Sequence, residues 1–132
     1  MPPPPLNGVL ETVLYCTSEN EPAVRRFYEE TLGLQKLDFD FAYRVAPNEL
    51  LLVFNADQTR DQARPPAHGA SGPGHMCFLT PADEYEGWKR YLQGAGVEIT
   101  DELTWGNGKR SFYFDDPAGN VLEIADGDIW AG

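Results

Sequence analysis

Three polar side chains, Glu11, His75 and Glu123, stand among apolar residues in segments with the alternation of β-strands. Alternate residues of a strand share one face, so each of the three lies on a face with apolar neighbours. A carboxylate in such surroundings costs free energy unless it is paired, hydrogen-bonded or bound to a metal. If the three converged, two carboxylates and one imidazole would suit a divalent cation. The three residues are therefore candidate ligands of one metal site.

An internal repeat relates the first two of these residues. Glu11 opens the strand pattern Glu-Thr-Val-Leu-Tyr, and His75 opens the pattern His-Met-Cys-Phe-Leu about 64 residues later. Each pattern precedes an amphipathic helix, and Val24 of the first helix matches Trp88 of the second. Two copies are too few for a solenoid, so we expect two similar modules related by a pseudo-twofold axis. Such an axis would bring their first strands together around one pocket.

Each half of the chain is predicted to contain one strand, one helix and three further strands. The first helix is expected to begin at Ser18 to Pro22, where capping residues and an early proline occur, and to end at Gly33. The second helix is expected over about 82–94. The predicted strands are 8–17, 35–39, 41–46 and 49–55 in the first half, and 74–80, 97–104, 109–115 and 120–126 in the second.

These elements predict an α+β fold in which two tandem βαβββ modules form a curved mixed sheet around a central metal cleft. Residues 1–132 would form a single domain, with module 1 at about 8–55 and module 2 at about 74–126. The intervening residues 56–73 are rich in Pro, Gly, Asp and Arg and are expected to be a linker. His68 lies in this linker and is expected to be a solvated loop residue.

Composition excludes several functional classes. The 132 residues are 42% hydrophobic and can bury a sizeable core. No run of apolar residues is long enough for a membrane span, and the N-terminus lacks the pattern of a secretory signal. A net charge of -11 argues against nucleic-acid binding and favours cationic partners or simple solubility. The isolated Cys16 and Cys77 predict neither disulfide nor zinc ribbon, so a cytoplasmic location is expected.

Three segments together resemble the vicinal oxygen chelate superfamily. Residues 26–34 (RFYEETLGL) are similar to the family's "FY…LGL" helix end, residues 74–78 (GHMCF) to its "GHxxF" strand, and residues 116–123 (DPAGNVLE) to its "DPxGNxxE" turn and strand. The resemblance extends from about Val9 to Ile124. The superfamily groups glyoxalase I, extradiol dioxygenases, fosfomycin-modifying enzymes, methylmalonyl-CoA epimerase and bleomycin-binding proteins.

The resemblance implies a ligand set for this chain. Family metal ligands fall on Glu11, His75 and Glu123, although the first position is more often His, or Gln in some glyoxalases. The fourth ligand of glyoxalase I falls within 51–54, where the sequence Leu-Leu-Val-Phe has no ligating side chain. A three-ligand site leaves positions open for a chelating substrate or dioxygen. The set suits Mn, Fe, Ni or Zn without choosing among them.

Simpler roles remain open for each residue. Glu11 could be an edge carboxylate or the ion-pair partner of Arg44 or Arg110. His75 could be a hydrogen-bonded core histidine, and Glu123 could cap the sheet edge. Cys77 would face the same pocket as His75, most simply as a small buried hydrophobic residue.

The substrate pocket is expected to have aromatic walls and basic anchors for an anionic group. The predicted walls are Phe54, Trp105 and Tyr113, and the predicted anchors are Arg44 and Lys109, with Arg110 as a further candidate.

Three functions are compatible with these features. The first is a metal-dependent lyase or isomerase acting on a small molecule, in which Glu11 or Glu123 serves as the base, a role implied by the resemblance. The second is a metal-free protein that sequesters an antibiotic, as bleomycin-binding members do. The third is an Fe(II) dioxygenase, which the absence of a second histidine ligand disfavours. Family resemblance also implies a homodimer, sometimes formed by exchange of modules.

Overall fold

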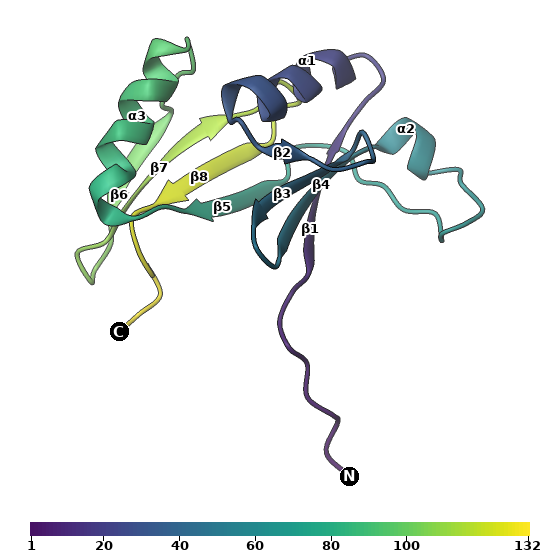
Figure 1. The fold of residues 1–132 in the computed structure, drawn as a ribbon, viewed down its shortest axis with the longest axis horizontal. Coiled ribbons are helices and arrows are strands. Elements are labelled where there is room, and N and C mark those ends of the chain that lie inside the picture. The colour runs from purple at the N-terminus through teal and green to yellow at the C-terminus, as the bar shows by residue number, and fades with distance from the viewer.

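The computed structural model describes all 132 residues and contains two four-stranded mixed sheets (Figure 1). In the first sheet the order is β1-β4-β3-β2, with strands β1 (Glu11–Cys16), β2 (Gln35–Lys36), β3 (Ala42–Ala46) and β4 (Glu49–Asn55). In the second the order is β5-β8-β7-β6, with strands β5 (His75–Leu79), β6 (Asp101–Thr104), β7 (Arg110–Asp115) and β8 (Val121–Ala125).

The two sheets repeat one topology, which confirms the predicted α+β fold of two βαβββ modules. In each module the first strand is an edge strand and pairs in parallel with the fourth. Glu11 pairs with Leu50 in this register, and His75 pairs with Val121. No strand of one module pairs with a strand of the other, so the curved surface consists of two separate sheets.

Several strands are shorter than the alternation predicts. Strand β1 begins at Glu11, and the ten residues before it form an exposed, extended segment that runs away from the body of the protein (Figure 1). Strand β6 begins at Asp101 because the Val97 N–H bonds to the Leu92 carbonyl and closes the preceding helix instead. The alternation of apolar and polar residues shows which side chains could face the core. A strand forms only where a partner strand is present, so the observed strands are shorter.

The first helical segment begins at Glu21, within the predicted range, and its hydrogen-bonding pattern changes after Arg26. Helix α1 (Glu21–Arg26) continues as a π-helical turn (Phe27–Thr31), whose wider loops are closed by the Leu32 N–H bonding to the Phe27 carbonyl. Gly33 ends it with a φ of 67°, a conformation that favours glycine. The turn buries Phe27 and Tyr28 against the core.

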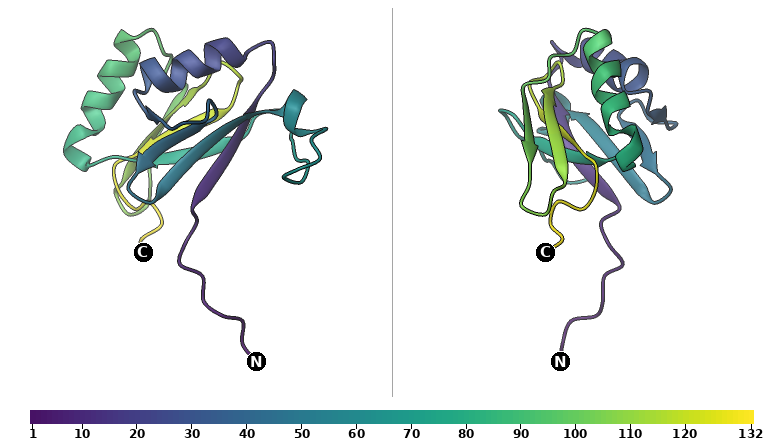
Figure 2. Two further views of the ribbon diagram at one scale, coloured as in Figure 1. Left: turned by 45° about the vertical axis from the view of Figure 1, so that its right-hand side comes forward. Right: turned by 90° about the vertical axis from the view of Figure 1, so that its left-hand side faces the viewer.

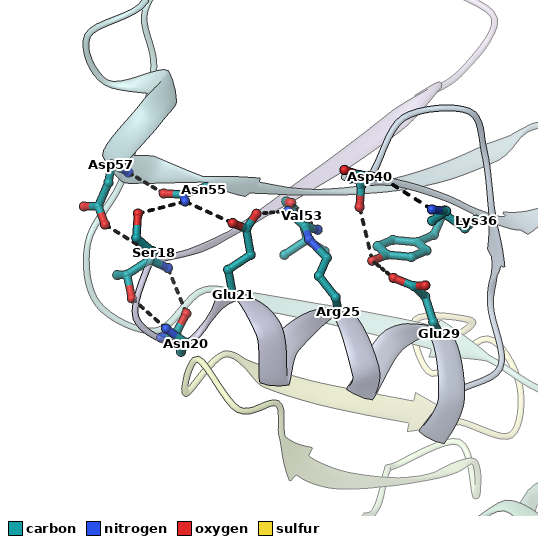
Figure 3. Close-up of polar contacts among 12 residues, drawn as sticks. Ser18, Asn20, Glu21, Arg25, Glu29, Lys36, Asp40, Val53, Asn55 and Asp57 are labelled. Carbon is teal, nitrogen blue, oxygen red and sulfur yellow. Dashed lines mark hydrogen bonds and ion pairs between the residues drawn. The ribbon is translucent and has the colours of Figure 1, made fainter.

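A short helix, α2 (Ala56–Thr59), opens the segment predicted to be a linker. The Asn55 side chain caps it by accepting a bond from the Asp57 N–H, and its amide also reaches Ser18 and Glu21 (Figure 3). Arg25 then joins Glu21 to the carbonyl of Val53 (Figure 3). These bonds tie the start of the linker to α1 and β4.

One core serves both modules. Helix α1 and helix α3 (Tyr85–Gly94), which follows a 3-10 turn at Ala82–Glu84, lie on the same side of the sheets (Figures 1 and 2). The buried cluster of 15 residues includes Val24 and Phe27 from the first module and Leu92 and Phe114 from the second. None of the helices is long and apolar enough to cross a membrane.

Candidate functional site

The faces of the sheets opposite the helices present the predicted polar residues. In β8, Leu122 and Ile124 belong to the core, so Glu123 points to the other face. Its direct neighbours across the sheet are Cys77 on β5 and Tyr113 on β7. Glu123 therefore lies on an inner strand of the second sheet, on the face opposite the helices.

His75 and Glu123 meet at this face. His75 Nε2 lies 3.3 Å from Glu123 Oε1, and His75 Nδ1 lies 2.8 Å from the Val121 carbonyl oxygen. A carbonyl only accepts, so Nδ1 carries a proton, and Nε2 is the ring nitrogen that faces the carboxylate. In histidine metal ligands, the ring nitrogen that does not bind the metal commonly donates to a backbone carbonyl, as Nδ1 does here.

Glu123 has the burial and the hydrogen bonding expected of a metal ligand. Its side chain is nearly completely buried, and Oε2 has no hydrogen-bond partner. A buried carboxylate oxygen without a partner is costly, and a divalent cation would compensate it. The donor set of one imidazole nitrogen and carboxylate oxygen thus fits a divalent metal.

A turn that begins at Asp116 positions Glu123. Asp116 Oδ1 accepts bonds from the backbone N–H groups of Ala118 and Asn120, at 2.8 Å and 2.9 Å. The Asn120 side chain donates to the Tyr15 carbonyl on β1 and accepts from the Gly74 N–H beside His75. The "DPxGN" pattern therefore fixes the start of β8 relative to β1 and β5.

Glu11 lies apart from the other two predicted ligands in the single chain. It borders a cleft of ≈ 780 Å³ on the first sheet, and no three His, Cys, Asp or Glu side chains of one chain are close enough to hold a metal together. Glu11 forms no ion pair: Arg44 bonds to the Pro47 carbonyl, and Arg110 pairs with Glu86 and Asp126.

The strand beside Glu11 offers no additional ligand. Leu50, Leu52 and Phe54 of β4 pair with Glu11, Val13 and Tyr15 and share their face. The fourth ligand position of glyoxalase I thus holds an apolar side chain in this chain.

The predicted substrate-binding residues are distributed over both sheets. Phe54 lines the cleft of the first sheet, and Arg44 shares its face because Arg44 pairs with Leu50. On the second sheet the ring of Tyr113 lies 6.2 Å from that of His75, and burial raises the pKa of Tyr113. The Trp105 indole donates to Ser111 Oγ, and Lys109 is exposed at the end of the sheet.

Arg110 and Cys77 differ from their expected roles. Arg110 points toward α3, where its guanidinium lies over the Tyr85 ring, so it is no anchor on the open face. Cys77 is exposed on that face beside Glu123 and is not the buried residue that its apolar context predicts.

His68 is a cleft residue that sequence reasoning missed. Its Nδ1 lies 2.7 Å from the Tyr15 hydroxyl, and its ring packs edge-on against Phe54 at 4.8 Å. It lines the cleft together with Glu11. The residues around it are Pro, Gly and Ala, which carry no pattern that would reveal the contact.

Comparisons with known proteins identify the family of the chain. Residues 17–124 match the family described as the Glyoxalase/Bleomycin resistance protein/Dioxygenase superfamily. The crystal structure of a lactoylglutathione lyase from Agrobacterium tumefaciens is 30% identical, with a TM-score of 0.83, and the match covers 96% of this chain and 98% of that one. The chain belongs to this superfamily.

More distant structures share the fold alone. A glyoxalase/dioxygenase from Nostoc punctiforme is 18% identical, with a TM-score of 0.69 and coverage of 95% of this chain and 94% of that one. A glyoxalase/bleomycin resistance protein/dioxygenase from Nocardioides is 18% identical, with a TM-score of 0.70 and coverage of 93% and 85%. No curated protein sequence matched the chain.

Proposed function

We propose that the protein is a divalent-metal-dependent lyase or isomerase that acts on a small substrate with two adjacent oxygen atoms. The observation that carries this proposal is the unpartnered Oε2 of the buried Glu123, beside Nε2 of an imidazole whose other nitrogen is bound to a backbone carbonyl. The 30% identity to a lactoylglutathione lyase supports the reaction class. The missing fourth ligand leaves the substrate itself unassigned.

The chain's own residues would divide the work between holding the ion and moving a proton. His75 and Glu123 would hold the ion, with Glu11 as the third ligand. A bound divalent ion supplies Lewis acidity, which stabilises negative charge on a substrate oxygen. A ligand carboxylate could act as the base once it is released from the ion, and Glu11 is the better candidate because it is exposed and forms no ion pair, whereas Glu123 is buried.

A second copy of the chain would complete this site. Glu11 is separated from His75 and Glu123 in one chain, and β1 and β5 each leave one edge unpaired. An open groove between them is mostly apolar and includes Leu10, Leu50, Phe78 and Leu79, while Val9 and Leu10 are largely exposed. A homodimer that covers this groove would bury the apolar side chains and bring Glu11 of one copy to His75 of the other.

Metal content measured on protein purified without chelator tests the proposal. We expect about one Mn, Fe, Ni or Zn ion per chain, and we expect Glu11→Ala, His75→Ala and Glu123→Ala each to lose it. His68→Ala is the matched control, because it removes the other histidine and should retain the metal. A wild-type protein that fails to take up any added divalent ion would refute a metal-dependent function.

The second candidate is a metal-free protein that sequesters its ligand. The observation in its favour is the cleft of the first sheet, whose aromatic and acidic lining could hold an organic molecule without a metal. Ligand binding with no metal uptake would favour this function. An Fe(II) dioxygenase remains a third candidate, distinguished by oxygen consumption when the iron-loaded protein is given a catechol.

A further inference from the structure

The cleft on the first sheet has a continuous aromatic wall. The Phe39 and Phe41 ring centroids are 5.5 Å apart, Phe41 and Phe54 are 4.7 Å apart, and Phe54 and His68 are 4.8 Å apart. The four rings come from the turn before β3, from β4 and from the linker, and all of them line the cleft. Aromatic walls of this kind favour a flat ring that can stack or pack edge-on.

The charges of the cleft select for a cation. Its carboxylates are Glu11, Asp38, Asp40 and Glu21. Glu21 is paired with Arg25 at 2.7 Å, and the exposed Asp40 lies 3.4 Å from Lys36 at the rim. Arg25 is the only Lys or Arg that lines the cleft, and its second bond goes to the Val53 carbonyl. No free cation therefore remains for an anionic ligand, and the faces of aromatic rings themselves attract positive charge.

A polar atom of the cleft lining is left without a partner. Thr59 is 6% exposed, lines the cleft, and its Oγ1 makes no hydrogen bond within the protein. The Thr59 carbonyl accepts a bond from the backbone N–H of His68 at 3.1 Å, which brings this residue beside Thr59. The Tyr15 hydroxyl occupies His68 Nδ1, so Nε2 is available to a ligand. Polar atoms among apolar walls are typical of small-molecule sites.

We propose that this cleft binds a planar aromatic molecule carrying a cationic amine, with the ring against Phe39, Phe41 and Phe54 and the amine near Asp38 and Asp40. The proposal deepens the proposed function by naming the class of its substrate, and it rests on that function for the chemistry that follows binding. Binding itself requires only the first module's lining. It can therefore be measured without a metal.

Tryptamine and indole-3-acetate test the proposal, because they carry the same ring with opposite charges. Isothermal titration calorimetry on the chelator-treated full-length protein should show tryptamine binding about tenfold more tightly at low ionic strength. The difference should shrink as salt is added. Equal or tighter binding of indole-3-acetate, or no binding of either probe, would overturn the proposal.

Variants assign the binding to the cleft. Phe39→Ala alters a side chain that is 62% exposed, so the fold should persist while tryptamine binding weakens about three- to tenfold. The double variant Asp38→Asn with Asp40→Asn should remove most of the preference for tryptamine. Glu30→Gln with Glu98→Gln removes the same charge at exposed positions outside the cleft and should preserve it. An equal loss in both double variants would contradict a local site.

These outcomes are independent of the metal proposal. His75→Ala lies on the second sheet and should retain tryptamine binding in chelator-treated protein while it loses metal. Normal metal uptake without tryptamine binding would refute the proposed class of substrate and leave the proposed metal site intact.

Discussion

The Tyr28 hydroxyl lies 2.5 Å from Oδ2 of Asp116, and this bond joins the first module's helical segment to the turn that positions Glu123. Both residues are buried, and they are 88 positions apart in the chain. Asp116 Oδ2 also accepts from the Asn120 side chain at 2.9 Å. The bond is therefore a direct buried link between the two modules.

Removing this hydroxyl should weaken the whole fold. Tyr28→Phe keeps the ring but leaves Asp116 with one fewer donor, so we expect a loss of about 1–3 kcal/mol in the free energy of unfolding. Urea denaturation measures it. Tyr91→Phe is the control, because its hydroxyl donates to the Thr31 carbonyl at an exposed site and should cost less. Equal losses of unfolding free energy in the two variants would show that the buried bond stabilises the fold no more than the exposed one.

Buried tyrosines should make the protein sensitive to alkali. Burial raises the pKa of Tyr43 to about 12, and it also raises the pKa of Tyr28 and of Tyr85. Because the folded-state pKa lies above the unfolded value of about 10, this stabilisation is complete below pH ~10 and is lost as the pH rises. Tyr43→Phe should flatten the fall in unfolding free energy above that pH, by up to about 1.4 kcal/mol per pH unit.

Ultraviolet absorbance of tyrosinate during a pH titration checks this directly. These three tyrosines should ionise only as the far-ultraviolet circular dichroism of the fold is lost. If all six tyrosines ionised together in the folded protein, the buried environment of these phenols would be disproved.

Glu123 should reduce stability in the absence of metal. Glu123→Met replaces an unpartnered buried oxygen with an apolar group of similar size, so chelator-treated protein should gain about 1–3 kcal/mol. Glu102→Gln is the matched control, because Tyr85 and Lys89 bond to Glu102 and its loss should destabilise. Thermal unfolding with and without added metal should show that only wild type is stabilised by the ion. Destabilisation by Glu123→Met without metal would argue against an uncompensated carboxylate.

Mixing two inactive variants tests whether two copies share the metal site. Glu11→Ala retains His75 and Glu123, and His75→Ala retains Glu11. If the ligands come from different copies, a heterodimer contains one complete site and one site that lacks both residues. Co-expressed variants should then recover metal at about a quarter of the sites by random pairing, whereas each variant alone recovers none. No recovery in a verified heterodimer would contradict a metal site shared between two copies.

Local patterns in the sequence were sufficient to predict the two modules. The match of Glu11 with His75 predicts two copies of one topology, and alternation correctly places Glu123 on a face with Val121 and Ala125. The "DPxGN" turn is local, because Asp116 bonds to residues only two and four positions ahead. Such features depend on neighbours in the chain, so they are visible in the sequence itself.

The site required tertiary structure, because distance in space does not follow from periodicity. Alternation states which face Glu11 occupies, but the relative placement of the two sheets separates it from His75 in one chain. The contact of His68 with Tyr15 depends on how the linker folds back over the cleft, and its Pro and Gly residues carry no periodic signal. The sequence by itself thus determined the modules and the chemistry of the candidate ligands. Only the packing of the two modules decided which of those ligands meet.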